Sequence, residues 1–261
     1  MNEPRNPYSP PTASVEAPLP QRVESGPVID NGRSVPIGNS TLWIKATYRL
    51  FSQRPWKWIG TMLLLALISI VASMLPLSSL LTTLLWPVVA GGIASALDEQ
   101  RQTQSFTLSS VFSGFGPRMP SLIAVGAVGL LSYGIMFLVM STMVGNDTAL
   151  AIMGSGEQLS VIPPGFWSAM IVTMVLTIPL TAATFLATPL IMLHGARPVD
   201  AMRMSFFGCM KNILPWIVSG VLMFFLVLVS IIPLLLGLFV TLPMAVMLFY
   251  SMYRDIFLDD L

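Results

Sequence analysis

Four long stretches of this 261-residue chain contain no Asp, Glu, Lys or Arg. They are residues 58–97, 119–146, 158–196 and 212–253, which are 40, 28, 39 and 42 residues long. Only 10% of the chain is charged and 54% is hydrophobic, whereas soluble domains carry about 25% charged residues. An apolar run of about 20 residues is long enough to cross a bilayer as a helix. The sequence therefore predicts an all-α integral membrane protein.

Prolines divide the longest of these stretches. A straight helix of about 40 residues would be about 60 Å long, twice the thickness of the hydrocarbon layer. Pro76 and Pro233 mark the turns, because proline cannot continue the helical hydrogen-bond ladder. The third stretch follows Pro163 and Pro164 and fits one long or tilted span. We therefore expect six transmembrane helices, at about 59–75, 78–97, 121–144, 166–193, 213–232 and 234–252.

The basic residues indicate the orientation of these spans. Six spans place all 13 Lys and Arg residues on one side. The opposite side then has two tight proline turns and the loop 145–165, whose charged residues are Asp147 and Glu157. Because loops rich in Lys and Arg stay in the cytoplasm, we expect both termini to be cytoplasmic.

Composition divides the chain into three parts. Residues 1–40 are polar and rich in proline, so we expect a disordered cytoplasmic tail. Residues 41–257 are expected to form the six-span membrane domain. Residues 258–261 would be a short cytoplasmic C-terminal tail.

Two segments of the chain look alike. "ATYRLFSQRPWKWIG" leads into span one, and "AMRMSFFGCMKNILPWIVSG" leads into span five. The matching positions are Ala46 with Ala201, Pro76 with Pro233, and Pro87 with Pro243. Both segments predict a repeated unit in which a basic amphipathic helix precedes a hairpin of two spans. Such repeats would be related by an axis along the membrane normal.

The leading helix of each unit is expected to lie in the membrane interface. An apolar stripe at spacings of three and four, with basic residues opposite, suits the headgroup boundary. In the first unit the stripe consists of Trp43, Ala46, Thr47, Leu50 and Phe51, and in the second of Val199, Met202, Phe206 and Cys209.

Six basic residues on or beside these helices are the predicted contacts to the lipid bilayer. They are Lys45, Arg49, Arg54, Lys57, Arg203 and Lys211. Near-surface basic residues contribute on the order of 1 kcal/mol each to binding of anionic membranes. Anionic lipid headgroups are therefore the expected partner, and other membrane proteins or a second copy of the chain stay open. The alternative is that these residues only fix orientation.

Five threonines share one face of span four: Thr173, Thr177, Thr181, Thr184 and Thr188. One interpretation is a polar path, which would make the protein a transporter or channel for neutral or apolar cargo. The simpler interpretation is packing, because threonines bond back to their own helix and small side chains let helices approach. No Asp, Glu, Lys or Arg lies within a predicted span, and this argues against an ion-coupled carrier.

The only histidine and cysteine, His194 and Cys209, raise the possibility of a membrane enzyme. A Cys nucleophile needs its base in hydrogen-bond contact, and their spacing gives no reason for that contact. We expect His194 to end span four ahead of Gly195 and Pro198, and Cys209 to pack as a small apolar residue. One Cys and one His give no multi-ligand metal or haem site, so we predict no enzyme activity and no cofactor. A net charge of +1 gives no reason to expect nucleic acid as a partner.

The C-terminal half carries "LHGARPVDAMRMSFFGCMKNILPW" and, near its end, "YRDIF". Together with "YRLFSQRPW", these segments resemble a family of bacterial six-span inner-membrane proteins with no assigned activity. The resemblance covers about residues 42–257. It implies a bacterial inner-membrane location and six spans, and it supplies no catalytic residue. We therefore expect a multi-pass inner-membrane protein that acts as a non-enzymatic accessory or scaffold bundle.

Overall fold

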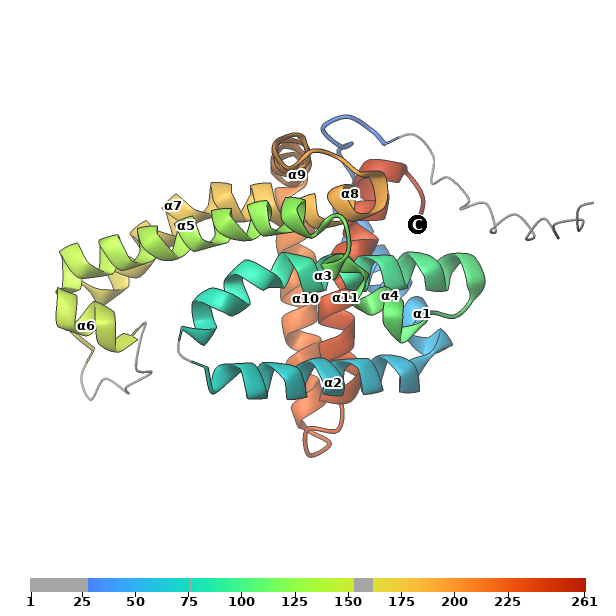
Figure 1. Cartoon of the computed structure of the whole chain (residues 1–261), viewed down its shortest axis with the longest axis horizontal. Coiled ribbons are helices and arrows are strands. Elements are labelled where there is room, and N and C mark those ends of the chain that lie inside the picture. Colours follow the sequence, from blue (N-terminus) through green and yellow to red (C-terminus); the bar gives the residue numbers. More distant parts are fainter. Residues whose placement is uncertain (1–27, 76, 153–161) are drawn as a thin grey trace, which may run out of the picture.

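The computed structural model describes residues 28–75, 77–152 and 162–261, and these residues form helices and connecting turns without any strand (Figure 1). The helices are α1 (Asn39–Gln53), α2 (Pro55–Ser73), α3 (Ser78–Thr103), α4 (Leu108–Val111), η1 (Ser113–Phe115), α5 (Met119–Val144), α6 (Asn146–Leu150), α7 (Phe166–Phe185), α8 (Ala187–His194), α9 (Pro198–Lys211), α10 (Ile213–Ile231) and α11 (Leu238–Leu258). The predicted all-α class is confirmed for the described residues.

Five helical segments of the described chain are long and apolar enough to cross a membrane: α2, α3, α5, the α7–α8 pair (Phe166–His194) and α10. Helix α11 has 21 residues but is not among them. Its last turns carry Arg254 and Asp255, which lower its hydropathy. The predicted count of six spans is therefore not confirmed by the helices themselves.

Large apolar side chains cover the outside of these helices. Leu67, Ile70 and Val71 on α2, for example, are all exposed, and so are Phe224 and Phe225 on α10. In water, apolar patches of this extent would cause aggregation, whereas in a bilayer they contact acyl chains. This distribution is that of a membrane-embedded protein.

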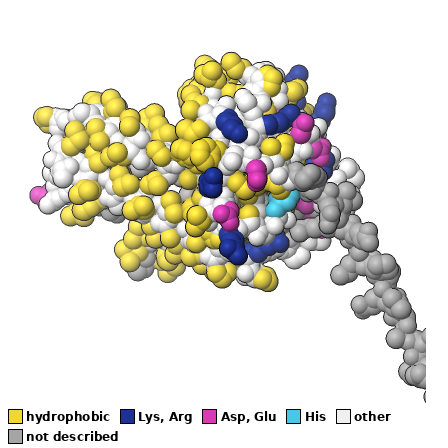
Figure 2. All heavy atoms as spheres, turned by 90° about the horizontal axis from the view of Figure 1, so that it is seen from above, with side chains coloured by type: hydrophobic (Ala, Val, Ile, Leu, Met, Phe, Trp, Pro, Cys, Tyr) yellow, Lys and Arg dark blue, Asp and Glu magenta, His cyan; other side chains and the backbone are white. Residues whose placement is uncertain are grey.

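Three helical hairpins extend from a common centre (Figure 1). The α2–α3 and α5–α7 hairpins point the same way, and the α10–α11 hairpin runs across them, so the arrangement differs from a bundle of parallel spans. We call the common centre the hub; it consists of residues 28–58, 98–118, 187–212 and 250–261. Most Lys, Arg, Asp and Glu side chains visible in Figure 2 gather over this part, while the lobe at the left of the view is largely apolar.

Part of the predicted disordered tail is packed on the hub. The backbone N–H groups of Ile29 and Arg33 donate to the carbonyls of Phe257 (2.8 Å) and Ile256 (2.9 Å). Val35 is buried, and its N–H donates to Asn212 Oδ1 at 2.8 Å. The prediction of disorder is therefore wrong for residues 28–40. Composition could not reveal their contacts, because the partner residues lie near the far end of the chain. Residues 1–27 lie outside the described part.

The C-terminal residues are also held. Helix α11 continues to Leu258, and the carboxylates of Asp259 and Asp260 pair with Arg33 and Arg254. Residues 258–261 thus belong to the hub rather than to a separate tail.

The predicted fourth span is broken at Leu186. Pro189 has no N–H to donate to the carbonyl of Phe185. The hydroxyl of Ser205 on α9 enters the gap: it accepts from Leu186 N–H at 2.9 Å and donates to the Ala182 carbonyl at 2.7 Å. A side chain inserted into the ladder bends a helix, so α7 and α8 replace the single predicted helix.

The apolar stripe of α1 faces protein, and the stripe of α9 does so only in part. On α1, Trp43, Thr47 and Phe51 are buried, and the helix packs mainly on α10 and α11. Helix α9 packs mainly on α7 and α8 and buries Ala201, whereas Val199 of its predicted stripe is 72% exposed. The stripe of α1 therefore faces protein rather than lipid, and the interfacial position of the two helices stays a prediction. Since the two helices pack on unlike neighbours, the predicted repeat is not confirmed either.

Candidate functional site

Three of the six predicted lipid-facing basic residues bind backbone carbonyls within the hub. Arg54 Nε donates to the carbonyl of Gln104 at 3.0 Å. Lys57 Nζ donates to the carbonyl of Phe106 at 3.1 Å and also lies over the Phe106 ring. Lys211 Nζ donates to the carbonyl of Gly32 at 2.9 Å. These three cations connect segments that are distant in the sequence, so they stabilise the packing of the hub.

The other three basic residues are exposed and have no acidic partner within the described chain. Lys45 and Arg49 lie one turn apart on α1, on the side opposite to Trp43 and Thr47. Arg203 on α9 lies over the ring of Phe207, 6.0 Å from its centroid. All six residues are exposed, and the predicted set therefore separates into three carbonyl-bound cations and three cations without such a bond.

Three side-chain contacts hold the rotation of α1. Trp43 Nε1 and Asn39 Nδ2 donate to Asp255 Oδ2 at 2.6 and 2.7 Å. One turn further, the hydroxyls of Thr47 and Ser251 share a hydrogen bond of 2.8 Å. Because these contacts fix one side of α1 to α11, the opposite side with its two cations must point outward.

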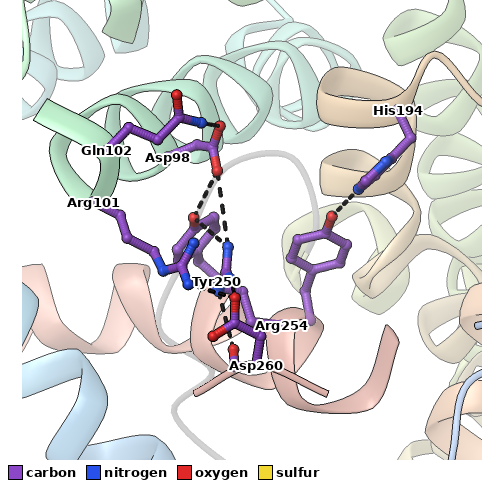
Figure 3. A network of polar contacts seen from close by, with 8 residues as sticks. Asp98, Arg101, Gln102, His194, Tyr250, Arg254 and Asp260 are labelled. Carbon is purple, nitrogen blue, oxygen red and sulfur yellow. Dashed lines mark hydrogen bonds and ion pairs between the residues drawn. The ribbon is translucent and has the colours of Figure 1, made fainter. Parts of the chain in front are cut away.

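A buried ion pair joins α3 to α11 (Figure 3). The side chains of Asp98 and Arg254 are only 5% and 4% exposed, and Arg254 Nη1 lies 3.9 Å from Asp98 Oδ1. Asp98 also accepts from the hydroxyl of Tyr250 at 3.0 Å and from Gln102 Nε2 at 2.8 Å. These donors compensate the buried carboxylate, as a charge at such depth requires.

The network of Figure 3 continues to the C-terminus, and a separate hydrogen bond beside it involves His194 of α8. Asp260 pairs with both Arg254 and Arg101, and His194 Nε2 bonds the hydroxyl of Tyr253. Sequence reasoning missed this network. Two features of the sequence could have indicated it: Asp98 directly follows the apolar run of span two, and Arg254 lies inside "YRDIF".

A groove of about 600 Å³ lies between α3, α5, the α7–α8 break and α11. Three threonines of the predicted polar path, Thr181, Thr184 and Thr188, line it, and Thr82 and Thr83 face them from α3. The other two members, Thr173 and Thr177, do not line it. The rest of the wall is mostly apolar, so the groove suits an apolar ligand with few polar atoms.

Most threonine hydroxyls of α7 bond back to their own helix. Thr177 donates to the Thr173 carbonyl at 2.9 Å, Thr181 to the Thr177 carbonyl at 3.1 Å, and Thr184 to the Leu180 carbonyl at 3.0 Å. A hydroxyl that donates in this way keeps an acceptor lone pair and shows its methyl group to the groove.

The paired prolines line different grooves. Pro87 lines the threonine-lined groove, next to Gly126, at which an added Cβ would meet the Leu84 carbonyl. Pro243 lines a smaller apolar groove of about 300 Å³, between α2 and the α10–α11 turn. The predicted correspondence of the two prolines therefore has no matching environment.

The structure gives Cys209 and His194 different polar partners. Cys209 is buried on α9, and its thiol contacts the hydroxyl of Ser205. Burial raises the pKa of this thiol from about 9 to about 12, so it stays protonated at neutral pH. His194 instead bonds Tyr253. A Cys nucleophile acts as its thiolate, and this environment opposes that form.

No family model, curated protein or solved structure matches this chain. The resemblance to bacterial six-span inner-membrane proteins therefore stays a prediction.

Proposed function

We propose that the protein is a non-enzymatic scaffold of the bacterial inner membrane whose hub binds anionic lipid headgroups. In this proposal the chain crosses the membrane six times, both termini are cytoplasmic, and the hub lies at the cytoplasmic surface. Lys45 and Arg49 on α1, with Arg203 on α9, make the contact.

The observation that supports this proposal is the fixed rotation of α1. Trp43 and Thr47 are bound to α11 on one side of the helix, and Lys45 and Arg49 are exposed on the other. Exposed cations without a counter-ion among the described residues, at the charged end of an otherwise apolar protein, suit the negative surface of anionic lipid.

A triple variant distinguishes this role from a merely structural or topogenic one. We expect K45Q/R49Q/R203Q to weaken binding of phosphatidylglycerol roughly a hundredfold, from about 1 kcal/mol for each cation lost. The measurement is lipid exchange into nanodiscs of phosphatidylcholine, in which phosphatidylglycerol is titrated. Binding should also fall as salt is added, because exposed charges are screened.

The matched control removes the same amount of charge from the three carbonyl-bound cations. R54Q/K57Q/K211Q should lower the melting temperature and leave phosphatidylglycerol affinity near that of the wild type, since these cations already bind carbonyl groups. Equal losses of lipid binding in both triple variants would show that only net charge matters, and no loss in the first would remove the lipid role.

The threonine-lined groove favours a second candidate, a carrier of neutral or apolar cargo. Three of the five aligned threonines lie in its wall, beside the backbone break at Leu186. Irregular backbone at membrane depth occurs where it is covered by protein or lines a cavity.

A pair of conservative variants tests the carrier. T181V/T184V keeps the shape of the groove wall and removes two hydroxyls, so uptake or release of a fluorescent apolar probe by proteoliposomes should change. T173V/T177V alters the same helix outside the groove and should leave it unchanged. Equal rates in both variants and in empty vesicles would exclude a path along this face.

A further inference from the structure

A second, polar cavity of about 630 Å³ lies within the hub. It is lined by the end of α3, the α4–η1 turn, the segment before α5 and the end of α8. Its volume is in the range of pockets that hold small molecules, about 300–1,000 Å³. None of the exposed basic residues discussed above lines it, so it is separate from the proposed lipid contact on α1.

Two charges of opposite sign line this cavity without an ion-pair partner among the described residues. Arg118 donates to the carbonyl of Met192 and meets no carboxylate. The Glu99 carboxylate accepts, within the described part of the chain, only from the N–H (3.3 Å) and hydroxyl (3.5 Å) of Thr107. Both side chains are half-buried. By contrast, the neighbouring Asp98 and Arg254 are paired with each other.

A buried hydroxyl in the same wall also lacks a partner. Ser95 on α3 is 8% exposed, and its Oγ forms no hydrogen bond within the described chain. Buried polar side-chain atoms are nearly always satisfied by protein or solvent, so an exception needs an explanation. A ligand in the cavity would supply the missing partner.

We propose that this cavity binds a small zwitterion. Its phosphate or carboxylate group pairs with Arg118, its primary ammonium pairs with Glu99, and Ser95 contributes a hydrogen bond. The planar guanidinium matches the oxygens of a phosphate or carboxylate, and a carboxylate accepts the N–H donors of an ammonium. One molecule with both charges thus compensates both residues.

Ligands with one charge fit less well. A lone anion would leave Glu99 unpaired and would be repelled by Asp98 in the same wall. A lone organic cation would leave Arg118 unpaired. A metal ion is also a poor fit, because no group of three His, Cys, Asp or Glu side chains able to hold one occurs within the described residues.

The proposed zwitterion is either a soluble molecule or a lipid headgroup, and free and lipid-linked probes distinguish the two. Calorimetry with free phosphoethanolamine, inorganic phosphate and ethanolamine tests a soluble ligand. Native mass spectrometry of protein released from nanodiscs that contain phosphatidylethanolamine, or phosphatidylglycerol in its place, tests a lipid headgroup. We expect phosphoethanolamine to bind at least about tenfold more tightly than phosphate or ethanolamine, or phosphatidylethanolamine to be retained in preference to phosphatidylglycerol, since each charge-assisted contact adds about that factor.

Substitutions in the cavity identify the groups that bind. R118Q should weaken binding about tenfold or more, and E99Q should abolish the preference for the probe with an ammonium group. R197Q and D147N make the same charge changes at exposed positions outside the cavity and should bind as the wild type does. S95A removes a hydroxyl that has no partner in the free protein, so its melting temperature should not fall while its affinity does.

The results decide the proposal in either direction. Binding of the free probe points to a soluble zwitterion, and retention of phosphatidylethanolamine alone points to a headgroup; both support the proposal if E99Q and R118Q impair them. Absence of both, or equal binding by wild type, E99Q and R118Q with unchanged melting temperatures, would overturn it. The lipid contact on α1 would be unaffected by that failure, because its test uses Lys45, Arg49 and Arg203.

Discussion

Arg254 pairs with two carboxylates at the junction of α3 and α11. Its guanidinium faces the buried Asp98 on one side and the half-exposed Asp260 on the other. Burying a charge is unfavourable unless it is paired and hydrogen-bonded. The two pairs therefore differ in energy although they share one arginine.

We expect R254Q to destabilise the protein by about 3–5 kcal/mol, because it leaves the Asp98 carboxylate buried without its cation. D260N should cost about 1 kcal/mol or less, because the Asp260 side chain is 46% exposed and its pairs are partly solvated. Equilibrium unfolding in mixed micelles measures both values. Similar losses in the two variants would contradict the assigned burial.

Residue chemistry alone could not have paired these groups. Tyr250 and Asp98 are separated by 152 positions, and Arg33 and Asp255 by 222. Propensity and periodicity report local structure, so contacts at that separation leave no pattern in a single sequence. The same reason explains why residues 28–40 were expected to be disordered: their proline-rich composition is visible, and their partners on α11 are not.

At the scale of helices, two glycines set how closely α3 approaches the α4–η1 turn. A Cβ on Gly92 would collide with the carbonyl oxygen of Val111, and one on Gly114 would collide with that of Val88. Backbone approach of this kind tolerates only glycine.

G92A should destabilise the protein by about 1–3 kcal/mol or more, because a backbone carbonyl cannot move aside as a flexible side chain can. The matched variant is G134A in α5, where an added Cβ meets nothing within 4 Å. That change should be neutral or stabilise by up to about 1 kcal/mol, from the higher helix propensity of alanine. Unfolding of both variants in the same micelles tests the difference, and a neutral G92A would contradict the crossing.

The helices themselves were largely predictable, because a run without charge has to be helical in a bilayer. The break at Leu186 was not, since it depends on Ser205, which is 19 residues away on another helix. Sequence also identified the aligned threonines, but not that only Thr181, Thr184 and Thr188 share a groove. It likewise grouped six basic residues, of which the fold binds three to backbone carbonyls and leaves three without such a bond.

At the scale of the whole molecule, the charged hub and the apolar hairpins are segregated (Figures 1 and 2). Such segregation suits a protein whose hub sits at one membrane surface while its hairpins lie in the hydrocarbon. The direction of α10–α11 across the other two hairpins is the feature that charge counting could not give. The proposed topology therefore depends on whether α11 crosses the membrane.

Accessibility of single cysteines to a membrane-impermeant maleimide tests this topology most directly. In a C209A background, cysteines replace Lys45, Asp147, Leu234 and Leu261 one at a time, and sealed cells are labelled before and after permeabilisation. Six crossings predict labelling of sealed cells at positions 147 and 234, and labelling at positions 45 and 261 only after permeabilisation. Protection of position 234, or labelling of position 45 or 261 in sealed cells, would contradict a hub confined to the cytoplasmic surface.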